Sequence, residues 1–202
     1  MDSYTIFPNK KIKAARPVSD RFLELGIDTF IGACRFVHEL PYGYNSNRDD
    51  LMILFEERFG TCSTKHAVIA TLAQELDRPI HRAMGIYAMT EEIVAGAGRI
   101  LKTHSLPYVP MIHCFLVYGN HRVDLTEGNH NGKQGPIDTF LYTEQVSPTI
   151  SAKDEYLLYR KALKDSILAG RDLAGTTLHV LLRAREEGLI LLKANLKQGA
   201  KA

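Results

Sequence analysis

The chain has 202 residues, of which 45% are hydrophobic and 24% are charged, and its net charge is +2. This size and balance predict a globular protein with a sizeable core and exclude extensive disorder. The small net charge and the lack of an apolar run of about 18 residues predict no nucleic-acid partner and no membrane partner. Three cysteines without a CxxC pair, and a start that lacks the pattern of a secretory signal, indicate a cytoplasmic location.

Helical patterns come first along the chain. Asp28 or Thr29 can cap a helix that Pro41 ends. A loop rich in turn-forming residues follows over residues 41–47. A short helix is then expected before Gly60, because acidic residues that suit a helix N-terminus precede an apolar stretch.

A longer helix is expected to begin near Cys62 and to end before Pro79. Its apolar residues form one stripe at helical spacing: Ile69, Leu72, Ala73 and Leu76. The elements beyond it are predicted in this order: a strand over 80–88, a helix over 90–102, strands over 111–118 and 121–126, an exposed loop over 127–136, a short strand over 140–146, and helices over 152–197 broken by glycines at 170, 175 and 188.

Cys62 is the first residue with an indicated chemical role, because it opens an amphipathic helix. The free backbone N–H groups and the positive end of the helix dipole favour the thiolate, which is the form that attacks a carbonyl. The same N–H groups can receive the oxyanion that such an attack creates. A lone cysteine is more often a small buried hydrophobic residue, so the interpretation depends on a partner base.

His113 is the expected base, on the strand that precedes a hairpin turn. Gly119-Asn120 suits a two-residue turn that pairs Tyr118 with His121. In that register Asp124 faces the same side of the sheet as His113, as its diagonal neighbour at roughly 7–8 Å between backbones. A carboxylate at this distance can fix the tautomer of the imidazole and stabilise its charged form.

The string Arg-x-Gly-x-Cys over 58–62, an alanine-containing helix, the strand histidine His113 and Val-Asp-Leu-Thr over 123–126 together resemble the transglutaminase-like superfamily of papain-like cysteine enzymes. The resemblance covers about residues 40–127 and keeps the order cysteine, histidine, aspartate. The chain departs from the family after the histidine, where Cys114 and a phenylalanine follow and tryptophan is absent.

The resemblance implies Cys62 as nucleophile, His113 as general base and Asp124 as the residue that orients the base. It also implies an oxyanion donor upstream of the cysteine, for which the loop offers Tyr44, Asn45 and Asn47, although a turn role is the alternative for the asparagines. No metal and no cofactor are expected, because the histidines and cysteines show no paired close spacing of the kind that zinc sites have.

The implied function is that of a cysteine-nucleophile enzyme acting on an amide or acyl bond through a thioester: a protease, an amidase or a transglutaminase-type acyltransferase. Its substrate would be a peptide, a protein or a small amide, and both hydrolysis and transfer stay open. The alternative is a catalytically silent module of the same fold that binds a peptide or a partner protein.

The resemblance and the order of elements together predict an α+β fold with a papain-like, transglutaminase-like core, in which N-terminal helices pack on an antiparallel sheet. Residues 1–150 are expected to form the catalytic domain, and residues 151–202 a helical extension that packs on the core or on a second subunit. An exposed apolar stripe on the C-terminal helices would favour a homodimer through them (Leu178, Leu181 and Leu182).

Overall fold

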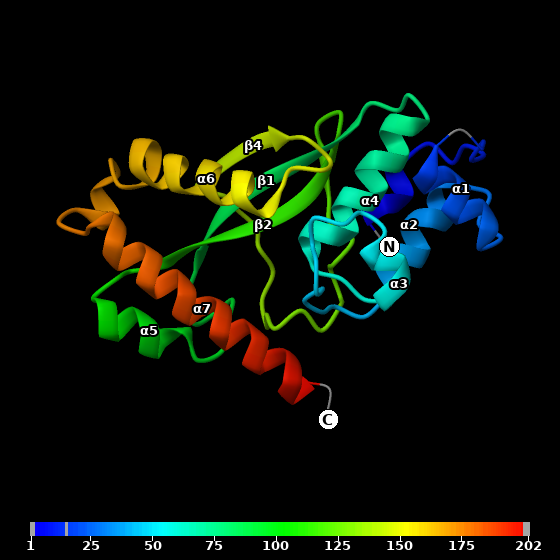
Figure 1. The fold of residues 1–202 in the computed structure, drawn as a ribbon. Helices are drawn as coiled ribbons and strands as arrows, with labels where there is room; N and C mark the ends of the chain where they lie inside the picture. Colours follow the sequence, from blue (N-terminus) through cyan, green and yellow to red (C-terminus); the bar gives the residue numbers. More distant parts are fainter. Residues whose placement is uncertain (1–2, 15, 200–202) are drawn as a thin grey trace. The chain divides into compact units, whose positions relative to one another are not determined.

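The structure is a computed structural model that describes residues 3–14 and 16–199. It is a mixed α+β protein with a four-stranded antiparallel sheet (Figure 1), as the element order predicted. The described elements are η1 (Ser3–Ile6), α1 (Pro17–Glu24), α2 (Phe30–Glu39), α3 (Ile53–Glu57), α4 (Cys62–Glu75), β1 (Ile80–Met89), α5 (Ala97–His104), β2 (Val109–Tyr118), β3 (His121–Val123), β4 (Tyr142–Val146), α6 (Ala152–Ala162), η2 (Leu163–Ile167), η3 (Arg171–Leu173) and α7 (Leu178–Gly199). The strand order in the sheet is β3-β2-β1-β4. None of the described helices is long and apolar enough to cross a membrane.

The chain folds into two compact units, each built from three segments. The first unit comprises the chain up to Met84 together with Cys114–Asn129 and Gln145–Ser151. The second unit comprises Gly85–His113, His130–Glu144 and the chain from Ala152 onward. The C-terminal helices belong to the same unit as the middle of the chain. The catalytic domain over residues 1–150 and the helical extension over 151–202 stay predictions.

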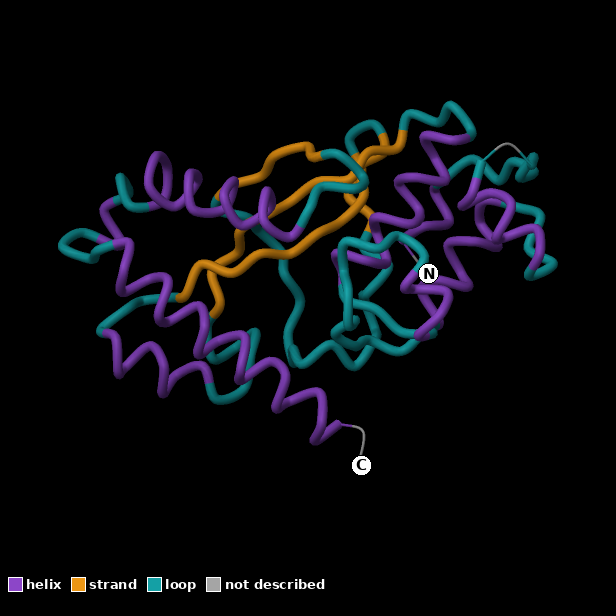
Figure 2. Tube along the Cα trace, in the orientation of Figure 1, coloured by secondary structure: helices purple, strands orange, loops and turns teal. Residues whose placement is uncertain are grey.

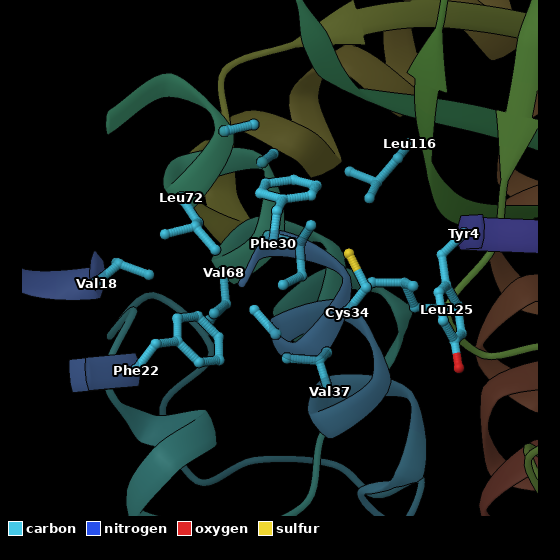
Figure 3. Packing of buried hydrophobic residues seen from close by; sticks show 14 of the residues in the cluster. Tyr4, Val18, Phe22, Phe30, Cys34, Val37, Val68, Leu72, Leu116 and Leu125 are labelled. Atoms are coloured by element: carbon cyan, nitrogen blue, oxygen red, sulfur yellow. The ribbon is translucent and has the colours of Figure 1, made fainter. Parts of the chain in front are cut away.

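The core of the first unit surrounds α4, which packs against α1, α2 and α3. Figure 3 shows buried side chains of this cluster, including Phe22, Val68 and Leu72. The predicted apolar stripe of α4 is confirmed, because its first three residues are fully buried and Leu76 is half-buried. The burial extends around the helix, so that Lys65 is also fully buried. A single apolar stripe did not predict this, since it assigns only one face of the helix to the core.

The predicted cap of the second helix is confirmed, whereas the predicted start of the helix over 90–102 is wrong. Thr29, one of the two predicted caps, caps α2, where its hydroxyl accepts a hydrogen bond from the Gly32 N–H at 3.2 Å. The helix expected over 90–102 begins only at Ala97. The preceding residues form a turn in which the Glu91 carboxylate accepts the N–H of Gly96, a residue with a φ of 88°. This turn takes the place of the first part of the predicted helix, and the Glu91 carboxylate lies at the start of α5.

The predicted register of the hairpin is confirmed. Tyr118 pairs with His121, and the pairing continues to Leu116 and Val123. Gly119 has a φ of 57°, a backbone conformation that glycine adopts without steric cost. The second strand, which was expected to reach residue 126, ends at Val123.

The second unit contains α5 packed side by side with α7 (Figure 2). Gly188 lies inside α7, although a break was expected there. A Cβ at this position would lie 2.9 Å from Met89 Cε and 3.3 Å from Met111 Sδ. The missing side chain therefore lets the helix backbone approach β1 and β2 closely, and the glycine serves packing instead of ending the helix.

The C-terminal apolar stripe is not exposed. Leu181 is fully buried, and Leu178 and Leu182 are half-buried. Since these leucines are covered within the chain itself, the exposed stripe that would favour a homodimer is absent from the described residues. A homodimer stays a prediction without this support.

Candidate functional site

Cys62 is the first residue of α4, a helix of 14 residues, and only 7% of its surface is exposed. The hydroxyl of Tyr42 donates to the Cys62 sulfur at a distance of 3.8 Å. Burial, with a smaller contribution from the charge of Cys62, raises the pKa of Tyr42 well above its usual value. Tyr42 therefore stays protonated and remains a hydrogen-bond donor to the sulfur.

Tyr42 reaches the sulfur because the residues on both sides of it form backbone hydrogen bonds with Gly60, which lies just before α4. Gly43 donates its N–H to the carbonyl of Gly60 at 3.3 Å, and Gly60 donates its own N–H to the carbonyl of Pro41 at 3.1 Å. A Cβ on Gly60 would lie 2.5 Å from Leu54 Cδ1 and 2.5 Å from the hydroxyl oxygen of Thr64 in α4. The glycine of the Arg-x-Gly-x-Cys string is thus a packing requirement of the corner before Cys62.

Asn45, predicted as an oxyanion donor, holds the same loop in place. Its amide nitrogen donates to Glu57 Oε2 at 2.9 Å and to the carbonyl of Phe59 at 2.8 Å. Its amide oxygen accepts the hydroxyl of Thr64 at 2.8 Å. Both amide N–H groups are engaged within the protein, so Asn45 positions the loop in this structure, and its oxyanion role stays a prediction.

The two other predicted oxyanion donors lie in the same loop. Tyr44 is 37% exposed and packs edge-on against Tyr42, with 6.4 Å between ring centroids. Asn47 accepts the backbone N–H of Asp49 at 3.2 Å, which is the turn role that asparagine often has. Within this loop, the residue whose hydroxyl contacts the sulfur is Tyr42. The oxyanion role of Tyr44 and Asn47 stays a prediction.

His66, which the sequence did not single out, ties the start of α4 to the segment that follows β3. Its Nδ1 lies 2.7 Å from the carbonyl oxygen of Cys62, and its Nε2 accepts the backbone N–H of Leu125 at 2.8 Å. Nδ1 therefore carries the proton and donates a hydrogen bond to the carbonyl oxygen of Cys62. With both ring nitrogens used in this way, His66 positions the first turn of α4 and does not serve as the base of the thiol.

Asp124 lies beside His66, with 3.4 Å between Oδ1 and Nε2. Oδ1 also accepts the backbone N–H of Thr126 at 2.8 Å and its hydroxyl at 2.7 Å. These bonds form a local turn that takes Asp124 out of the strand, which is why the predicted second strand stops early. The carboxylate is held in a fixed orientation, with 17% of its side chain exposed.

Lys65 is fully buried next to these residues. Its ammonium donates to the carbonyls of Leu40 and His38, at 2.5 and 3.2 Å, and to Asn129 Oδ1 at 2.6 Å. Burial lowers the pKa of Lys65 to about 8, and the charge of Asp124 opposes this effect. Since the last carbonyls of a helix have no partner within it, Lys65 caps the C-terminus of α2 from the neighbouring helix.

His113 belongs to the second unit and is 2% exposed. Its ring stacks on that of Phe140, with 6.5 Å between centroids and 6° between planes. Phe140 lies over Gly85 of β1, where a Cβ would overlap the aromatic ring. The absence of a side chain at Gly85 makes room for the Phe140 ring, which stacks on the imidazole.

The structure thus groups Tyr42, His66 and Asp124 around the start of α4 and places His113 in the second unit. The roles of Cys62 and His113 as nucleophile and base stay predictions. In the part of the chain that the structure describes, no three histidine, cysteine, aspartate or glutamate side chains form a group that could hold a metal ion. Comparison with family models, with curated proteins and with solved structures found no match.

Proposed function

We propose that the protein is a cysteine-nucleophile enzyme of the transglutaminase-like kind, which acts on an amide or acyl bond through Cys62, His113 and Asp124. One observation carries the proposal. The Cys62 sulfur lies at the N-terminus of a long helix and accepts a hydrogen bond from a half-buried tyrosine. A helix terminus and a hydroxyl donor both stabilise a thiolate, and neither is needed by a cysteine that only fills space.

In the proposed reaction, His113 takes the proton of the Cys62 thiol, and the sulfur attacks the carbonyl carbon of the substrate. The oxyanion collapses with cleavage of the bond to the leaving amine, to which the imidazolium of His113 gives its proton. Water or a second amine then resolves the thioester. Asp124 orients His113, and the Tyr42 hydroxyl and the N–H groups of α4 stabilise the sulfur and the oxyanion.

The proposed substrates are a peptide, a protein or a small amide, and the proposed location is the cytoplasm. The three cysteines are thiols and not disulfides. This state accords with a reducing compartment.

Alkylation with iodoacetamide followed by mass spectrometry tests the proposal. Cys62 is expected to react with an apparent thiol pKa well below 8, while Cys34 stays unmodified because it is fully buried and burial raises its pKa. His113→Ala is expected to raise the apparent pKa of Cys62 toward ~8.5 and to slow labelling at pH 6.5 at least tenfold. His121→Ala, an exposed histidine of the same hairpin, serves as the control.

Labelling of Cys62 that begins only at about pH 8.5, in the wild type as in His113→Ala, would contradict the proposal and favour the silent binding module. Equal slowing in both histidine variants would point to a general disturbance of the hairpin and would remove the support for His113 as base.

Tyr42→Phe separates the contribution of the hydroxyl from that of the helix. The variant keeps the ring but removes the donor at 3.8 Å from the sulfur. A hydrogen bond to a charged group contributes roughly 1.5 kcal/mol or more, so labelling of Cys62 at pH 6.5 is expected to slow about tenfold. Tyr44→Phe, in the same loop, is expected to label at the wild-type rate. A Tyr42→Phe variant that labels as fast as Tyr44→Phe would exclude a role of the hydroxyl.

A further inference from the structure

A pocket of about 480 Å³ lies in the first unit, away from Cys62. It is formed by the second half of α4, the start of β1 and the segment around the end of β4. Its nearest α4 residue, Ala70, is eight residues beyond Cys62, which corresponds to ~12 Å along the helix axis. The lining residues are Ala70, Gln74, Arg78, Ile80, His81, Arg82, Gln145, Val146, Ser147 and Pro148.

The polar part of this lining consists of donors and positive charges. Arg78, His81 and Arg82 line the pocket, and no aspartate or glutamate is among the residues that line it. Glutamine and serine side chains supply further N–H and O–H groups. An anion is the ligand that such a lining favours, since it can accept several of these hydrogen bonds at once.

Arg78 has a buried donor that a bound anion could satisfy. Its Nε is buried and has no hydrogen-bond partner among the described residues, although its backbone N–H is bonded to the carbonyl of Ala73 at 2.8 Å. A buried donor without a partner costs roughly 1–3 kcal/mol, and the cost is larger for a charged group. A bound oxyanion that accepts this N–H would remove the cost.

Arg82 supplies a fixed charge in the same lining. The residue is 1% exposed, and its guanidinium donates to the carbonyl of Pro148 at 3.0 Å and to the sulfur of Cys114 at 3.3 Å. These two contacts hold the group in place at the pocket wall. A positive charge that is positioned before binding loses little side-chain entropy when an anion arrives.

The rest of the wall is apolar, through Ala70, Ile80, Val146 and Pro148. The volume falls in the range of pockets that hold small molecules, which runs from roughly 300 to 1,000 Å³. We propose that this pocket binds a small organic anion, whose phosphate or carboxylate group contacts Arg78 and whose short apolar body lies on this wall. The proposal concerns a site separate from Cys62 and does not depend on the proposed enzymatic activity.

NMR of the arginine Nε–Hε signals tests the proposal, with the full chain titrated by inorganic phosphate, acetate or butyrate at constant ionic strength. At least one of these probes is expected to shift the Arg78 signal in a saturable way, and butyrate is expected to bind more tightly than acetate because of its apolar body. Preference for phosphate or for acetate identifies the head group. Arg78→Gln is expected to weaken binding at least tenfold, whereas Arg35→Gln, an exposed arginine of α2, leaves it unchanged.

Shifts that grow linearly without saturation for all three probes would overturn the proposal, as would equal weakening by Arg78→Gln and Arg35→Gln, because both results describe nonspecific screening of charge. If Arg78→Gln does not fold, His81→Gln takes its place, since His81 is an exposed residue of the same lining. An affinity in the folded His81→Gln variant that equals that of the wild type would equally exclude the site.

Discussion

Replacement of Lys65 by methionine is expected to lower the free energy of unfolding by about 2–4 kcal/mol at pH 7. The methionine side chain fills a similar volume but leaves the carbonyl of Leu40 and the Oδ1 of Asn129 without the ammonium that they now accept. It also removes the positive charge near Asp124, which raises the cost of keeping that carboxylate largely buried. Denaturant unfolding at pH 7 measures the loss.

Lys13→Met is the matched control, since Lys13 is an exposed lysine of the same unit. It is expected to change the free energy of unfolding by less than about 0.5 kcal/mol. A Lys65→Met variant that is as stable as the wild type at pH 7 would show that the three hydrogen bonds of the ammonium do no more than offset its desolvation.

The pH dependence of this difference gives a second, independent readout. The pKa of Lys65 is about 8 in the folded state, below that of a lysine in an unfolded chain, so the unfolded state binds more protons between about pH 8 and pH 10.5. The free energy of unfolding of the wild type, relative to Lys65→Met, is therefore expected to rise with pH across this window. The part of the stability that comes from the neutral form of Lys65 is fully present above about pH 10.5 and is lost as the pH falls through 8. A difference that stays constant from pH 7 to 10 would contradict the lowered pKa.

Gly60→Ala is expected to lower the free energy of unfolding by about 1–3 kcal/mol and to slow the labelling of Cys62. The added methyl group would overlap Leu54, which is fully buried, and the hydroxyl of Thr64, which is bonded to Asn45. Relief of the overlap requires a shift of the corner before Cys62. Such a shift moves the loop that carries Tyr42 away from the sulfur.

Gly26→Ala is a suitable comparison, because Gly26 lies in the same unit and a Cβ there would meet no atom within 4 Å. Its φ of 75° makes the alanine somewhat strained, so a modest loss of stability is expected without any change in the labelling of Cys62. Unchanged labelling in Gly60→Ala would show that the glycine is needed only for packing and not for the position of Tyr42.

The sequence predicted those features that depend on neighbours along the chain. The start of α4 at Cys62 follows from a local change of pattern, and the pairing of Tyr118 with His121 follows from the glycine that begins the turn. Parity then limits which residues share a face. Such signals extend over a few residues and do not require knowledge of the core.

The features that the sequence did not predict depend on contacts between distant segments. Lys65 and His66 are polar residues of α4, which other elements contact on several sides. The spacing of apolar residues along a helix predicts one buried face and cannot predict that these polar residues are buried as well. Tyr42 and Tyr44 look equivalent in a loop without periodicity, and only the bonds of Gly60 to both sides of Tyr42 distinguish them. The pattern of alternating polar and apolar residues that reveals a strand or a helix has no counterpart there.

The division of each unit into three segments has a consequence for the newly made chain. On the ribosome, the first segment of the second unit appears long before α7, the helix whose Gly188 approaches Met89 and Met111. Until α7 has been synthesised, it cannot pack against these methionines. Contacts between segments that lie far apart in the sequence also form slowly. The nascent protein therefore passes through a stage in which apolar strand residues face the solvent, where chaperones can bind them.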